Sequence, residues 1–194
     1  MKHYTQITPP TVEPIAVADF VAFARTGGAT EDAATIATLI SVARGVVEDA
    51  TGRALMLSGW RVVADGWTGG EITWHGDVMT LDRTPLVDVS SVKYYAEGAT
   101  TLTTLSPADY VVITGTEPGS VQLLINPPAL AERPDAVQIE FTAGAASPEL
   151  VPAVLRHAVR LQAADYYEKR ADLGKISDGI RHLLDSQRVA GWVA

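Results

Sequence analysis

Apolar residues recur at helical spacing near both ends of the chain. The clearest stripe runs between a candidate N-cap at Thr30 and a candidate stop at Gly52. Its apolar members are Ile36, Leu39, Ile40, Ala43, Val46 and Val47. Spacing of three and four residues puts such side chains on one face of a helix. Similar patterns predict a short helix over 15–26, a helix that begins near Ser147, and a last helix within 176–194.

The middle of the chain, residues 59–142, has a different pattern. Short segments rich in β-branched and aromatic residues, such as "WRVVADGW" and "AVQIEFTAG", are separated by Gly, Pro, Asp or Asn. This pattern is typical of short antiparallel strands. "WTGG" and "AEGA" have the composition of hairpin turns. The segment therefore predicts an antiparallel sheet, sandwich or small barrel.

The order helices, strands, helices predicts an α+β fold, in which an antiparallel β module is inserted into a helical bundle. The expected parts are an extended N-terminal arm (1–14), the bundle (15–58 and 147–170), the β module (59–146) and a C-terminal tail or helix that docks on a partner (171–194). Within the first long helix, Gly45 costs about 1 kcal/mol relative to alanine, and its small size suggests close helix packing.

The composition of the chain narrows the range of possible functions. The chain has 194 residues, no cysteine and a net charge of −8. The charge is uneven, because residues 1–149 carry −10 and residues 150–194 carry +2. An acidic body argues against nucleic-acid binding as the main activity. Neither a secretion signal nor an apolar run long enough to span a membrane is expected.

One stretch, "FTAGAASPELVP" (141–152), has the order of a phosphate-binding site: strand, glycine turn, helix start. It has one glycine and no lysine, so it matches neither a P-loop nor a dinucleotide-binding turn. Glu149 in the first turn would also repel an anion. We therefore interpret the stretch as a connector between strand and helix.

Other candidate chemistry is sparse. His3, His75, His157 and His182 do not pair at the spacing of metal ligands. The acid pairs Glu48–Asp49 and Asp65–Glu71 are expected on a solvated surface. The aromatic residues Trp60, Trp67, Trp74, Tyr94 and Tyr95 are expected to pack in a core or an interface. No catalytic residue, cofactor or metal is predicted.

Several segments in this order resemble one known family. They are "LISVARGVVEDATGRAL", the expected strand that contains Trp60 and is followed by Trp67, "LDRTPLVDVSSVKYY", "DYVV", "AVQIEFTAGAA" and "VPAVLRHAVRLQAADYYEKR". Their order and spacing are similar to those of the head–tail connector (adaptor) proteins of long-tailed phages, in the branch with a β insertion. Gene transfer agents carry a similar adaptor. The resemblance covers about residues 15–170.

The resemblance implies a structural virion protein and not an enzyme. Such adaptors form a ring, usually dodecameric, under the portal protein at the virion neck. The ring extends the DNA channel, through which DNA passes without sequence-specific binding, and it supports a tail-side stopper or neck protein. In this family the C-terminal segment often reaches into the portal. Carried over here, this suggests portal docking by Arg181, Arg188 and Trp192, although Trp192 could instead pack on its own helix.

The residues alone are also compatible with two other functions. One is a small hydrolase or nucleotide-binding enzyme built on the β module, which would need a pocket with convergent polar groups. The other is an interaction module outside virions that binds a ligand along a sheet edge.

Overall fold

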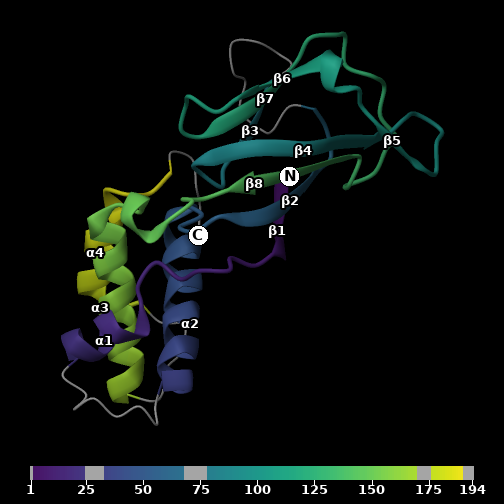
Figure 1. Cartoon of the computed structure of the whole chain (residues 1–194). Coiled ribbons are helices and arrows are strands. Elements are labelled where there is room, and N and C mark those ends of the chain that lie inside the picture. The colour runs from purple at the N-terminus through teal and green to yellow at the C-terminus, as the bar shows by residue number, and fades with distance from the viewer. Residues whose placement is uncertain (1, 25–32, 68–77, 170–175, 190–194) are drawn as a thin grey trace. The chain divides into compact units, whose positions relative to one another are not determined.

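The computed structural model describes residues 2–24, 33–67, 78–169 and 176–189. The chain forms two compact units (Figure 1). Unit 1 comprises Met1–Pro9 and Ser58–Gly144, and unit 2 comprises Pro10–Leu57 and Ala145–Ala194. Unit 1 holds the strands and unit 2 the α-helices. The predicted α+β fold with a β module between helical segments is confirmed.

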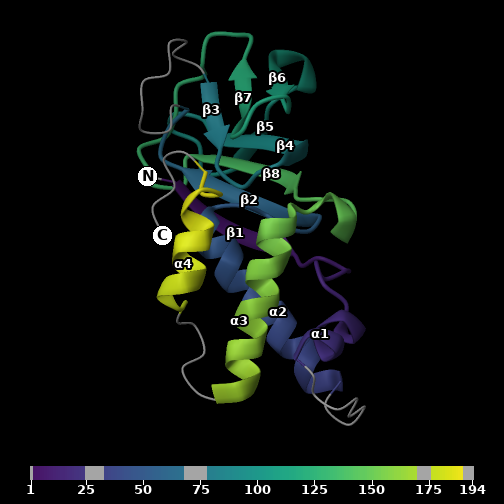
Figure 2. The same ribbon diagram turned by 90° about the vertical axis from the view of Figure 1, so that its left-hand side faces the viewer.

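Unit 2 is a helical bundle (Figures 1 and 2). Its α-helices in the described residues are α1 (Val17–Ala24), α2 (Ala33–Thr51), α3 (Ala153–Lys169) and α4 (Asp178–Asp185). The segments that leave α2 and lead into α3 are joined by a parallel bridge between Met56 and Ala145. Since the end of α2 lies near the start of α3, the two helices run in opposite directions.

The core of the bundle follows the predicted stripe. Ile36, Ile40, Ala43 and Val47 of α2 are buried against Leu155, Ala158 and Tyr166 of α3. Gly52 ends α2 with a φ of 76°, a conformation that glycine adopts without strain. Thr30 lies outside the described residues. Gly45 was expected to allow close helix packing, but a Cβ added there would meet nothing within 4 Å.

The returning helix begins later than the sequence suggested. Pro148–Leu150 form a 3-10 turn, η3, and the Ser147 side chain makes no capping hydrogen bond there. Helix α3 begins at Ala153, and the carbonyl of Pro152 accepts from the N–H groups of Leu155 and Arg156. Proline lacks an N–H, so it disrupts a helix interior but fits just before or at the first turn. Pro152 therefore marks the helix start.

Unit 1 contains two antiparallel sheets. The strands are β1 (Lys2–Thr8), β2 (Ser58–Ala64), β3 (Val78–Leu81), β4 (Leu86–Tyr95), β5 (Leu102–Thr104), β6 (Tyr110–Ile113), β7 (Gly119–Leu123) and β8 (Val137–Ala143). One sheet has the order β1-β2-β8-β4-β5 and the other β3-β7-β6. A short 3-10 turn, η2 (Pro107–Asp109), precedes β6. The "AEGA" turn connects β4 to β5, whereas "WTGG" lies mainly outside the described residues.

Buried and more exposed residues alternate along strands such as β2 and β8, so each of these strands has one face toward the core and one toward solvent. In β2 and β8 every second residue is buried, including Trp60 and Phe141. The sheets approach closely where Gly119 of β7 faces Leu86 of β4. A Cβ on Gly119 would lie 2.6 Å from the Leu86 Cβ. The absence of a side chain at residue 119 therefore sets the spacing of the layers at this point.

The N-terminal segment differs from the expected extended arm. Lys2–Thr8 form the edge strand β1, which pairs with β2 from Lys2↔Ala64 to Thr8↔Gly59. The Tyr4 hydroxyl donates to the Asp82 carboxylate at 2.9 Å and accepts from the Asp82 N–H at 2.9 Å. Burial, with a smaller effect of the Asp82 charge, raises the pKa of Tyr4 above its ordinary value. These contacts fix the segment to the β module.

Candidate functional site

The residues expected to dock on a portal lie at the end of unit 2. Arg181 is exposed on α4, and Arg188 follows the helix, with its Nη2 3.9 Å from the Asp185 Oδ1. Trp192 lies outside the described residues. The structure therefore places two of the three residues on the same short segment. Their role in docking stays a prediction.

The segment that carries these arginines is anchored to the bundle. Val189 is buried, and its N–H donates to the Thr51 carbonyl at 2.8 Å. The Arg53 Nε donates to the Gln187 carbonyl at 2.8 Å. Ile180 and Leu184 bury the apolar face of α4, which lies in the last helix that the sequence predicted. The C-terminal segment is thus attached to the end of α2 as far as Val189.

A buried ionic network ties the start of unit 2 to the middle of α2. The Arg44 Nε lies 2.8 Å from Glu13, and its Nη1 lies 2.7 Å from Glu48. The other Glu48 oxygen accepts from the Leu55 N–H at 2.8 Å. Glu48 was expected on a solvated surface, but it is buried because this ion pair and hydrogen bond satisfy its charge. The network is structural, since its members hold two backbone segments against α2.

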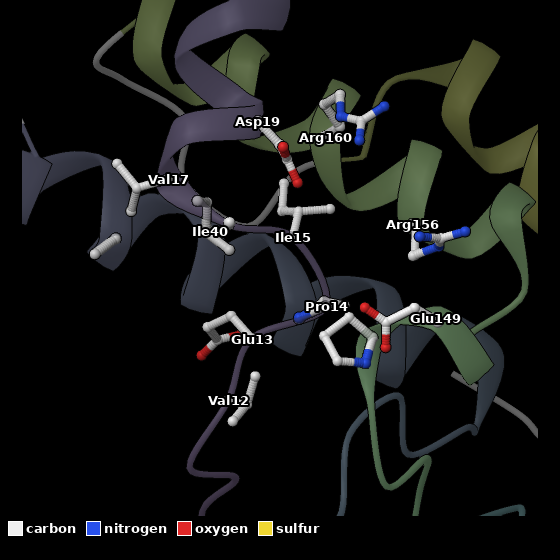
Figure 3. Close-up of a pocket in the computed structure, with 13 residues that line it drawn as sticks. Val12, Glu13, Pro14, Ile15, Val17, Asp19, Ile40, Glu149, Arg156 and Arg160 are labelled. Carbon is white, nitrogen blue, oxygen red and sulfur yellow. The ribbon is translucent and has the colours of Figure 1, made fainter.

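A pocket of about 350 Å³ lies within unit 2, with charged side chains of both signs on its walls (Figure 3). Its walls come from the segment before α1, from α1, α2 and α3, and from η3. Arg156 and Arg160 of α3 line it together with Asp19 and Glu149. A hydrogen bond from Ser147 lowers the pKa of Glu149 below its ordinary range, with a smaller contribution from the nearby charge of Arg156. Neither arginine was selected from the sequence, although their spacing of four residues places them on one side of a helix.

The remaining candidates in the described ranges do not converge on a reactive site. The His157 ring packs edge-on against Phe23, with centroids 6.2 Å apart. His182 is exposed, 3.7 Å from Asp185. Trp60 and Trp67 are buried, consistent with the expected packing role. His75, Glu71 and Trp74 fall outside the described residues, and among the described ones no cluster of three potential metal ligands occurs. No helix in the described ranges is both long and apolar enough to cross a membrane.

Solved structures match this chain over nearly its whole length. A chain from "Neck of empty GTA particle computed with C6 symmetry" is 26% identical, with a TM-score of 0.74 over 97% of this chain and 96% of that one. A chain from "Virion of native gene transfer agent (GTA) particle" is 24% identical, with a TM-score of 0.72 over 96% and 95%. A chain from "Neck of native GTA particle computed with C12 symmetry" is 23% identical, with a TM-score of 0.69 over 97% and 96%. No family model and no curated protein matches.

These matches and the architecture agree on a class of protein. A helical bundle with an inserted β module, matched end to end by chains of a particle neck, is the fold of a structural neck protein. The matched particles are gene transfer agents, so the resemblance to adaptors of this kind, drawn from the sequence, is confirmed. The chains that match are structural parts of virions.

Proposed function

We propose that this chain is a structural adaptor of the virion neck, of the kind found in gene transfer agent particles. The observation that carries the proposal is the match to a neck chain at 26% identity across 97% of the chain. Agreement over this length involves both units and the connections between them. The alternative of a hydrolase or nucleotide-binding enzyme has no comparable support, and we infer that the chain acts without catalysis.

The adaptor works as part of a ring. Two of the matching necks were determined with C6 and C12 symmetry, which supports an oligomeric ring around the particle axis. A closed ring repeats one contact between unlike surfaces, so modest contacts add up to a stable assembly. Twelve copies per ring is the stoichiometry that we propose.

The portal-facing element in this proposal is the C-terminal segment. Its support is the position of Arg181 and Arg188 on an anchored, surface-exposed segment that ends the described chain. In this proposal, residues 190–194, which include Trp192 and follow the anchored segment, also contact the portal. On the opposite side of the ring, the adaptor would support a stopper or neck protein. DNA would pass through the channel, since the acidic character of the chain disfavours adhesion.

The test is reconstitution with the portal protein of the same particle. We expect the chain and portal to copurify as a ring-on-ring complex visible by electron microscopy. Truncation after Val189, and separately Arg181→Ala with Arg188→Ala, should weaken portal binding at least tenfold while the chain remains folded. A chain that neither forms rings nor binds portal, and is absent from particles, would refute the adaptor function. Retention of full portal binding by both variants would refute the assigned docking residues only.

A further inference from the structure

The pocket of unit 2 contains two arginines, Arg156 and Arg160, whose Nε atoms have no hydrogen-bond acceptor among the described residues. Neither Arg156 nor Arg160 has a carboxylate within ion-pair distance there, and the Nε atom of each is buried without a hydrogen-bond acceptor. Arg160 lies over the Phe23 ring at 5.6 Å, which is a weaker contact than an ion pair. A buried N–H without an acceptor costs about 1–3 kcal/mol. A ligand carrying a carboxylate would therefore be favoured at this position.

The acids around the pocket do not fill this role. Glu13 is bound by Arg44 at 2.8 Å, and Glu149 accepts a hydrogen bond from Ser147. Asp19 is exposed and forms no ion pair with a described residue. Figure 3 shows Asp19 and Glu149 beside the two arginines, on separate elements. The pocket therefore contains two buried N–H donors, the Nε atoms of the arginines, that have no acceptor. Its acids are either bound to other groups or exposed to solvent.

Exposed apolar side chains accompany the pocket. Val12, which lines it, is 51% exposed, and Leu150, next to the lining residue Glu149, is 68% exposed. Apolar contact area beside charged donors is typical of a protein interface with a polar anchor. Such a surface favours a protein ligand over a small free anion.

Charge is divided unequally between the units. Unit 1 carries 5 Lys or Arg and 11 Asp or Glu, giving −6, whereas unit 2 carries 10 and 12, giving −2. Two thirds of the basic residues therefore lie in unit 2. In a closed ring each copy meets its neighbours through two different surfaces. The net negative charge of one unit and the arginines in the pocket of the other are complementary for such a contact.

We propose that the pocket between α1, α2, α3 and η3 is an inter-subunit socket, in which Arg156 and Arg160 bind a carboxylate side chain from unit 1 of the adjacent copy in the ring. This inference rests on the proposed ring function and identifies the surface that closes the ring.

The first experiment measures ring formation by native mass spectrometry across a concentration series. The double variant Arg156→Ala/Arg160→Ala should raise the concentration needed for half-assembly at least tenfold. Lys169→Ala is the matched control, since it removes one positive charge from the same helix but does not line the pocket. It should assemble like the wild type. Thermal unfolding and circular dichroism establish that each variant is folded.

The second experiment identifies the occupant directly. Arg160→Lys introduces an amine that a carbodiimide couples to a neighbouring carboxylate. Rings assembled from equal amounts of ¹⁵N-labelled and unlabelled chains should yield mixed-isotope crosslinks between position 160 and an acid of unit 1. Crosslinks only within one chain, only to portal, or a DNA-dependent assembly defect would overturn the proposal. Wild-type chains that form no ring at all would instead refute the adaptor function on which it rests.

Discussion

The spacing of the two sheet layers in unit 1 depends on the absence of a side chain at Gly119. In Gly119→Ala the new methyl group would lie 2.6 Å from the Leu86 Cβ, 2.7 Å from the Leu86 Cδ2 and 3.1 Å from the Ile113 carbonyl oxygen. Carbon atoms in ordinary contact are about 3.5–4.0 Å apart. Rotation moves the Leu86 Cδ2 away but leaves its Cβ in place. The strands β4 and β7 must therefore separate by about 1 Å.

We expect this separation to cost about 2–3 kcal/mol, in the upper part of the range for overpacked cores. With an m-value of about 2 kcal/mol/M, the urea midpoint of unit 1 should fall by roughly 1 M. Tryptophan fluorescence follows the transition, because Trp60 and Trp67 are buried in unit 1.

Gly115→Ala is the matched control, since a Cβ there would meet nothing within 4 Å. Its unfolding free energy should stay within about 0.5 kcal/mol of that of the wild type, as for most surface substitutions. If Gly119→Ala is as stable as Gly115→Ala, the contact with Leu86 does not set the layer spacing and the reasoning is wrong.

Three further predictions concern the ionic contacts and α2. Arg44→Met leaves the buried carboxylate of Glu48 without its ion-pair partner, so unit 2 should lose about 3–5 kcal/mol of unfolding free energy in urea titration; a loss below about 1 kcal/mol would contradict this. Gly45→Ala should raise the stability of α2 by about 1 kcal/mol, since no neighbour within 4 Å opposes the methyl group; a lower urea midpoint would count against it. A hydrogen bond from Arg61, with a smaller effect of the Lys93 charge, lowers the pKa of Glu140. Its stabilisation is therefore present above the ordinary carboxyl pKa and lost as the pH falls through the lowered value. Glu140→Gln should cost about 0.5–1 kcal/mol at pH 7, and this cost should shrink as the pH falls below the ordinary carboxyl pKa; a difference independent of pH would refute the assignment.

Much of the fold was readable from the sequence because periodicity reports burial. The spacing of apolar residues from Ile36 to Val47 fits only a helix with one buried face, and the structure buries that face. The alternation in "AVQIEFTAG" likewise required a strand with one core face, as β8 has. The class of neck protein followed from the order of several such segments. Local pattern and global fold agree at these places.

Other features depended on residues far apart in the sequence. Lys2–Thr8 became a strand because β2, more than fifty residues later, offered an unpaired edge, and no local signal announces that pairing. Glu48 became buried because Glu13, Arg44 and Leu55 meet around it. Arg156 and Arg160 could be recognised as a candidate binding site only from the structure, which shows that their Nε atoms have no acceptor. Sequence alone determined which faces are apolar, because that depends on residue type and spacing. Tertiary structure decided which charged groups form ion pairs and which hydrogen-bond donors have no acceptor. This pairing depends on distances between segments that local patterns do not encode.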